Sequence, residues 1–99
     1  MGLDLFVALY LIIGFLLGNG VPHFVFGAAG KVFRSPFGQR SSPKMNVLWG
    51  VSNFAVATII AIALDILGLY DSYALVAMLT GFWLVMLMFG VRIKMFLNE

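Results

Sequence analysis

The sequence predicts an all-α membrane protein with three transmembrane helices and an interfacial or re-entrant segment between the first and the second. Hydrophobic residues make up 63% of the 99 residues and charged residues only 10%, whereas soluble domains are nearer half apolar and a quarter charged. The apolar residues form three long runs, and most charged residues lie between or after them. Because a soluble fold of this size cannot bury so much apolar surface, we expect one integral membrane domain over residues 1–99.

The first span is predicted at about residues 3–21, around the run LFVALYLIIGFLLG that begins at Leu5. This length approaches the roughly 17–25 residues that a spanning helix needs. A cleaved signal would have basic residues ahead of its apolar run, but Asp4 stands there. We therefore expect a retained membrane helix.

The second and third spans are predicted at about residues 46–69 and 72–92, in the runs NVLWGVSNFAVATIIAIALDILGLY and SYALVAMLTGFWLVMLMFGV. Helices are expected because an open sheet would leave backbone groups unpaired in lipid. Only the turn Tyr70-Asp71-Ser72 separates the two runs. The sequence therefore predicts that these two helices form a tight antiparallel hairpin.

The charges fall on two sides of this arrangement. Asp4 and Asp71 lie on one side of the predicted membrane, and all six basic residues lie on the other: Lys31, Arg34, Arg40, Lys44, Arg92 and Lys94. Basic residues mark the cytoplasmic side of membrane proteins. The sequence therefore predicts an outside N-terminus and a cytoplasmic C-terminus.

The basic connection, about residues 22–45, is too apolar for a solvated tail, with phenylalanines that include Phe24, Phe26 and Phe33. Pro22 can open a helix, so one interpretation is a short helix in the cytoplasmic interface. A re-entrant loop is the alternative, because the glycines of this segment permit close backbone approach. RSPFGQRSSPK is typical of turns, and Ser41 or Ser42 before Pro43 predicts the start of the second span.

Small residues at helical spacing are candidates for helix packing, since lipid supplies no hydrophobic drive for helix association. They occur in all three spans, as Gly14, Gly18, Gly50, Ala57, Ala61, Ala77 and Gly81. We expect these faces to join the helices to one another and to a second copy or another protein.

The polar residues Asn46, Asn53 and Asp65 of the second span belong to one stripe, because steps of three or four residues join them through Trp49, Gly50, Ala57 and Ala61. This face is either a packing surface or a polar pathway, with His23 near its inner mouth. Asp65 either reaches the outer interface or binds a proton or cation. His23 is a capping or interfacial histidine, a proton relay, or part of a ligand site shared between copies.

The basic residues of the connection, Lys31, Arg34, Arg40 and Lys44, either orient the protein on anionic lipid or form a phosphate pocket beside glycine-rich backbone. The chain has no cysteine and a single histidine, so no metal site is expected. We find no nucleophile–base–orienter set and no nucleotide-binding motif. The sequence therefore predicts no enzyme and no cofactor, and a net charge of +2 is too small to indicate nucleic acid.

Two stretches, GNGVPHFVFGAAGKVFRSPFG and SSPKMNVLWGVSNF, carry a resemblance to a group of proteins. They resemble uncharacterised small bacterial three-span membrane proteins with a GNGxPHF…SPF…NVxWG pattern, over Gly18 to Phe54. The resemblance implies the bacterial cytoplasmic membrane and carries no activity over to any residue.

Three functional hypotheses follow. The first is a non-enzymatic homo-oligomer or accessory subunit of a larger membrane complex. The second is a minimal homo-oligomeric transporter or channel for an ion or small solute. The third is binding of anionic lipid by Lys31, Arg34 and Arg40. The absence of a catalytic set and the small-residue faces favour the first.

Overall fold

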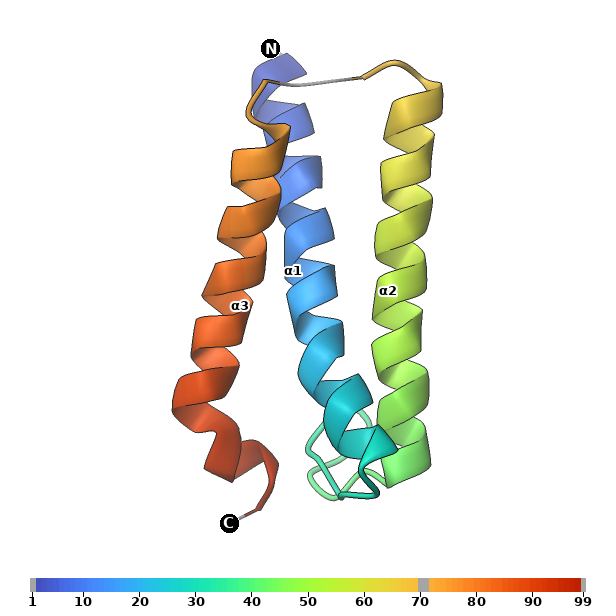
Figure 1. Ribbon diagram of the computed structural model, residues 1–99, viewed down its shortest axis with the longest axis vertical. Helices are drawn as coiled ribbons and strands as arrows, with labels where there is room; N and C mark the ends of the chain where they lie inside the picture. The colour runs from blue at the N-terminus through green and yellow to red at the C-terminus, as the bar shows by residue number, and fades with distance from the viewer. Residues whose placement is uncertain (1, 70–71, 99) are drawn as a thin grey trace.

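Three long helices make up most of the computed structural model, which describes residues 2–69 and 72–98 (Figure 1). They are α1 (Gly2–Ala28), α2 (Pro43–Ile66) and α3 (Ala74–Phe96). Leu5–Ala28, Pro43–Ile66 and Ala74–Phe96 are long and apolar enough to cross a membrane. The predicted all-helical class and three spans of membrane length are therefore confirmed. Tyr70 and Asp71 of the predicted turn lie outside the described residues, as does the side chain of Asp4.

The helices lie in the order α2, α1, α3, with α1 between the other two (Figure 1). α1 packs against both neighbours, while over the described residues no Cα atom of α2 lies within 8 Å of a Cα atom of α3. The predicted tight hairpin of the second and third helices is therefore wrong. The physical reason is that α1 carries small residues on two faces and so accepts a neighbour on each.

One face of α1 is fitted to α3 through glycines. A Cβ at Gly14 would collide with the Met78 carbonyl, and one at Gly18 would collide with the Val85 side chain. From the other side, a Cβ at Gly81 would meet the Leu11 carbonyl. The two backbones can approach this closely only because these positions lack side chains.

The opposite face of α1 is fitted to α2 in the same way. A Cβ at Gly50 would lie 2.8 Å from both the Gly20 carbonyl oxygen and the Phe24 amide nitrogen. Ala57 and Ala77 are buried in an apolar cluster with Tyr10, Ile13 and Leu64, and Ala61 packs half-buried against it. The small-residue faces named from the sequence therefore lie between helices of one chain, and contact with another protein would use other surfaces.

Pro22 lies inside α1, and the predicted start of a separate interfacial helix at this residue is wrong. The helix continues to Ala28, past the predicted end of the span at residue 21. Proline removes one backbone hydrogen bond, but helices in membranes tolerate it when neighbouring helices cover the site. Here Pro22 is buried.

The helix ends follow their local sequence. Ser42 caps α2 by accepting a hydrogen bond from the Met45 amide at 3.1 Å, with Pro43 as the first helical residue; the predicted start signal is confirmed. After α2, Gly68 adopts a φ of 67°, and the Leu69 amide donates to the Leu64 carbonyl. This is a Schellman motif, which favours glycine at the left-handed position.

The connection between α1 and α2 folds back against the helices as a compact loop of residues 29–42. Phe33 is 0% exposed and stacks on Phe26 of α1 and Phe96 of α3, with ring centroids 5.0 and 5.5 Å apart. The Arg34 amide donates to the Phe96 carbonyl at 2.7 Å, and Asn98 Nδ2 donates to the Gln39 carbonyl at 2.8 Å. The loop and the end of α3 therefore form one end of the molecule, here called the basic end.

Candidate functional site

A hydrogen bond between His23 of α1 and Asn46 of α2 forms the centre of the basic end. His23 Nδ1 and Asn46 Oδ1 are 2.7 Å apart, and the two residues are 2% and 0% exposed. Buried polar side chains are stable only when hydrogen-bonded. The sequence named both residues for a polar pathway, and the structure brings them together.

Asn46 also holds the loop. Its Nδ2 lies 2.8 Å from the Phe33 carbonyl oxygen, 3.2 Å from that of Ser41 and 3.0 Å from that of Ser42. The loop carries its own reinforcement, because the Ser41 hydroxyl donates to the Gly38 carbonyl at 2.8 Å. One buried amide thus ties the loop to α2 and, through its oxygen, to the histidine of α1.

A second amide pair lies deeper between α1 and α2. Asn19 Nδ2 donates to Asn53 Oδ1 at 3.0 Å, and Asn53 Nδ2 donates to the Trp49 carbonyl at 2.8 Å. Asn53 is 3% exposed. Asn19 is not among the site residues predicted from the sequence, although its place one helical turn before His23 puts both on one face of α1.

Aromatic rings enclose the histidine. The His23 ring meets those of Phe33 and Phe89 edge-on, at centroid distances of 5.1 and 5.7 Å. Phe89 in turn lies 4.8 Å from Phe96. Edge-to-face contacts of this kind hold rings in a fixed orientation, so the imidazole is held by packing as well as by its hydrogen bond.

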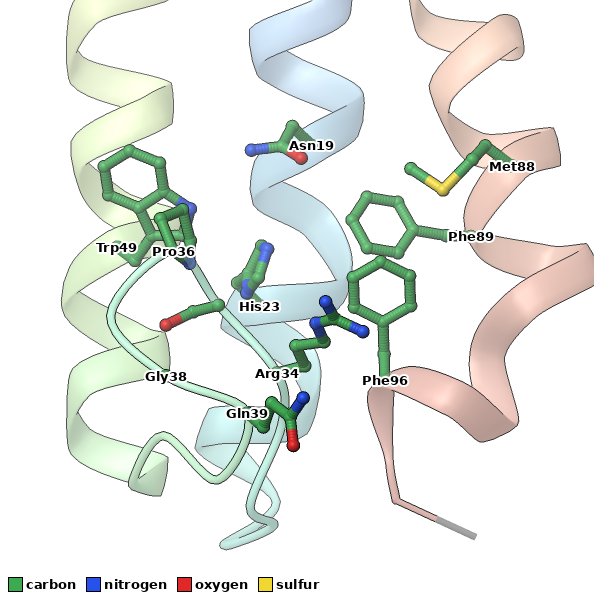
Figure 2. A pocket seen from close by; sticks show the side chains of 11 residues that line it. Asn19, His23, Arg34, Pro36, Gly38, Gln39, Trp49, Met88, Phe89 and Phe96 are labelled. Carbon is green, nitrogen blue, oxygen red and sulfur yellow. The ribbon is translucent and has the colours of Figure 1, made fainter.

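A cavity of about 480 Å³ opens among the three helices and the loop. Figure 2 shows its lining residues: polar groups from α1 and the loop face the aromatic rings of α3, and Trp49 of α2 lies at the opposite side. The lining residues are Asn19, His23, Arg34, Ser35, Pro36, Gly38, Gln39, Trp49, Met88, Phe89 and Phe96.

Arg34 is the cation of this cavity. It is half-buried there, whereas Lys31, Arg40 and Lys44 are exposed and lie outside the lining. Over the described residues the Arg34 side chain has no ion pair or side-chain hydrogen bond. Of the four basic residues that the sequence predicted to contact headgroups, only Arg34 therefore lines the cavity.

Trp49 contributes a buried donor that has no acceptor. Its Nε1 is the one buried side-chain nitrogen or oxygen without a hydrogen-bond partner in the described part of the chain. The ring is held in place by an edge-on contact with Phe37 at the loop tip, 5.4 Å between centroids. An unsatisfied buried donor is uncommon in native structures and calls for an explanation.

Asp65 is not part of this site. It is exposed on α2, twelve residues beyond Asn53, which at about 1.5 Å per residue is roughly 18 Å along the helix axis. Between them Ala57 and Leu64 are buried in the apolar cluster with Tyr10 and Ile13. Within one chain, Asn46 and Asn53 of α2 therefore belong to a polar cluster at the basic end, and they do not form a continuous polar pathway with Asp65.

Metal-binding side chains do not gather here. Over residues 2–69 and 72–98 no group of three or more histidine, cysteine, aspartate or glutamate side chains could hold an ion. The chemistry of the cavity is that of hydrogen-bond donors, with one guanidinium and one imidazole.

No family model matches this chain, and no curated protein or solved structure matches it either. Function must therefore be inferred from the chemistry of the site itself.

Proposed function

We propose that this chain is a non-enzymatic bacterial inner-membrane protein that binds the phosphate-bearing headgroup of an anionic lipid in the cavity at the basic end. The observation that carries the proposal is that Arg34 and Trp49 line one cavity, while the Arg34 guanidinium and the buried Trp49 Nε1 have no hydrogen-bond partner among the described residues. Both groups can only donate hydrogen bonds. Their natural ligand must therefore bring acceptor oxygens and negative charge, as a phosphate does.

The position of the cavity supports a lipid as the source of that phosphate. α2 has 24 residues, about 36 Å at 1.5 Å per residue, a few ångströms more than the roughly 30 Å hydrocarbon core. The basic end would then lie at the headgroups. The cavity joins donors to apolar side chains such as Met88, Phe89 and Phe96, which suits a molecule with a charged head and a hydrocarbon tail.

The exposed cations support the same orientation. Lys31, Arg40, Lys44, Arg92 and Lys94 are exposed at the basic end, where each would contribute about 1 kcal/mol of attraction to an anionic leaflet. We infer that this end faces the cytoplasm and that the N-terminus lies outside.

Assembly with a second copy or within a larger complex stays a prediction, as does transport. The small-residue faces that favoured assembly are occupied by contacts within the chain. Asp65 lies far from the polar group at the basic end. Lipid binding is therefore the hypothesis that the geometry supports best.

The test compares two arginines of the same loop. Protein extracted gently from membranes is examined by native mass spectrometry as wild type, Arg34→Ala and Arg40→Ala. A hydrogen bond to a charged group is worth about 1.5–3 kcal/mol, so Arg34→Ala should lose anionic lipid roughly tenfold or more. Arg40 is exposed, and its removal should reduce retention less, by an amount that salt screens.

Trp49→Phe provides a second arm, because it keeps an aromatic ring against Phe37 and removes only the Nε1 donor. It should weaken retention of the same lipid as Arg34→Ala does. Equal retention by wild type, Arg34→Ala and Trp49→Phe would show that the cavity holds no headgroup.

A further inference from the structure

We infer that His23 presents an unprotonated Nε2 to the cavity, so that the preferred ligand is a phosphate ester that also carries a hydroxyl. This inference rests on the proposed binding of a headgroup and adds the class of headgroup. The preferred ligand, whether lipid headgroup or free ester, is a phosphodiester with a free hydroxyl, as in a glycerol headgroup. A phosphodiester without a hydrogen-bond donor is the disfavoured alternative.

The first step is the orientation of the Asn46 amide. One terminal atom of this side chain lies 2.8, 3.2 and 3.0 Å from the carbonyl oxygens of Phe33, Ser41 and Ser42. Only an amide NH₂ group can face three carbonyl oxygens, because an oxygen there would meet acceptors alone. The amide oxygen of Asn46 must therefore be the atom that faces His23.

The second step fixes the tautomer of the imidazole. An amide oxygen only accepts hydrogen bonds, so His23 Nδ1, at 2.7 Å from Asn46 Oδ1, must carry the proton and donate it. In a neutral imidazole the other nitrogen is then an acceptor. The ring is 2% exposed between Phe33 and Phe89, and an unpaired buried charge would be costly beside Arg34, which favours the neutral form.

His23 Nε2 has no hydrogen-bond partner among the described residues. His23 lines the cavity (Figure 2). Arg34 and Trp49 Nε1 are donors that need acceptor oxygens, while the unprotonated His23 Nε2 is an acceptor that needs a donor. Phosphate oxygens can accept hydrogen bonds from Arg34 and Trp49 Nε1, and a hydroxyl of the same headgroup can donate one to His23 Nε2. One ligand can therefore satisfy all three groups.

The direct test uses the fact that the chain has one histidine. With ¹⁵N-labelled histidine in lipid nanodiscs, the nitrogen spectrum should show a protonated Nδ1 and an unprotonated Nε2. A ring protonated at Nε2, either as the other tautomer or as the imidazolium, overturns the inference. This measurement is made on the wild-type protein and needs no variant.

The binding test compares lipids that share a phosphodiester charge. Nanodiscs containing phosphatidylglycerol, phosphatidylmethanol or phosphatidylcholine alone separate the hydroxyl from the charge. The wild type should retain phosphatidylglycerol roughly tenfold better than phosphatidylmethanol, the effect of leaving one buried acceptor unpaired. Equal retention of these two anionic lipids overturns the inference and leaves the proposed function standing, whereas no preference of either over phosphatidylcholine overturns both.

His23→Asn is the matched variant. Its amide NH₂ can replace Nδ1 as the donor to Asn46, but nothing replaces Nε2. It should retain the two anionic lipids equally while remaining folded, and a preference as large as that of the wild type would overturn the role of His23. Competition with soluble glycerophosphoglycerol, a phosphodiester with free hydroxyls and no acyl chains, separates the two sources of the same chemistry: displacement of the lipid indicates that a free diester is accepted, and lack of displacement indicates that the acyl chains are needed.

Discussion

Removing the Asn46 side chain should release the loop of residues 29–42 from the helices. Asn46→Ala removes every hydrogen bond of the amide, but the consequences differ among the groups left behind. The Ser41 carbonyl still accepts from the Phe33 amide at 3.2 Å, and the Ser42 carbonyl from the residue 46 amide at 3.0 Å. The Phe33 carbonyl and His23 Nδ1 lose the partners they have in the structure.

The expected magnitude follows from those two groups. Each buried polar group left unsatisfied costs about 1–3 kcal/mol, so the free energy that holds the loop closed should fall by roughly 2–6 kcal/mol. Since about 1.4 kcal/mol corresponds to a tenfold change in an equilibrium constant, hydrogen exchange at the Phe33 and Arg34 amides should accelerate by roughly 30-fold or more. The measurement is amide hydrogen exchange in nanodiscs, supported by trypsin cleavage after Lys31, Arg34 and Arg40.

Asn98→Ala is the control for this experiment. It removes one exposed bond from the loop, that from Asn98 Nδ2 to the Gln39 carbonyl, which is worth about 0.5–1.5 kcal/mol. Its effect on exchange should be clearly smaller. Wild-type exchange rates in Asn46→Ala would refute the view that this amide latches the loop.

Three further predictions use matched positions. Gly14→Ala should destabilise the protein by about 1–3 kcal/mol through overpacking, because the alanine Cβ would meet the backbone of α3. Gly90→Ala should be neutral or slightly stabilising, because nothing lies within 4 Å of a Cβ at that position. Equal unfolding midpoints of the two variants in detergent would contradict this prediction. Tyr10→Phe should lower the free energy of unfolding by about 0.5–1.5 kcal/mol, since the Tyr10 hydroxyl donates to the Leu69 carbonyl at 2.9 Å. An unchanged unfolding midpoint would count against that hydrogen bond. The chain lacks cysteine, so single cysteines at Lys31 and Ser72 can be labelled from either side of the membrane; Ser72→Cys should react from outside intact cells and Lys31→Cys should not, and the reverse pattern would invert the proposed orientation.

The number of helices could be predicted because it depends on composition over long runs. In lipid, length and apolar character decide what spans, and local signals such as Ser42-Pro43 set the start of α2. The gathering of all basic residues at one end also follows from span number alone. These features need no knowledge of which helix packs against which.

The helix order and the course of α1 could not be predicted, because both depend on tertiary contacts. The short turn after the second run indicated a hairpin, but the glycines of α1 place that helix between its neighbours. The sequence predicts a helix start at Pro22, because proline is favoured in the first turn of a helix, whereas a proline inside a helix costs about 3 kcal/mol in water. Burial of Pro22 between packed helices makes the interior position tolerable.

The candidate site could be predicted only in part. Helical spacing identified Asn46 and Asn53, but spacing within α2 cannot show that Asn46 meets His23, 23 residues away in sequence. The Trp49 donor was missed, because an indole near a helix end usually indicates an interfacial anchor. Its lack of a partner is visible only once the surrounding atoms are placed.

The fold and the proposed site share groups at the basic end, and this decides which substitutions can separate binding from folding. Asn46 and Phe33 are unsuitable, because they hold the loop against the helices and their loss would disturb the cavity only through the loop. Arg34 is suitable: its contribution to the fold is the backbone bond from its amide to the Phe96 carbonyl, which Arg34→Ala preserves. If Arg34→Ala loses lipid while its loop amides exchange at wild-type rates, the guanidinium acts on the ligand itself. If lipid retention and loop protection fall together, the effect is on the loop, and the proposed contact between Arg34 and a headgroup is refuted.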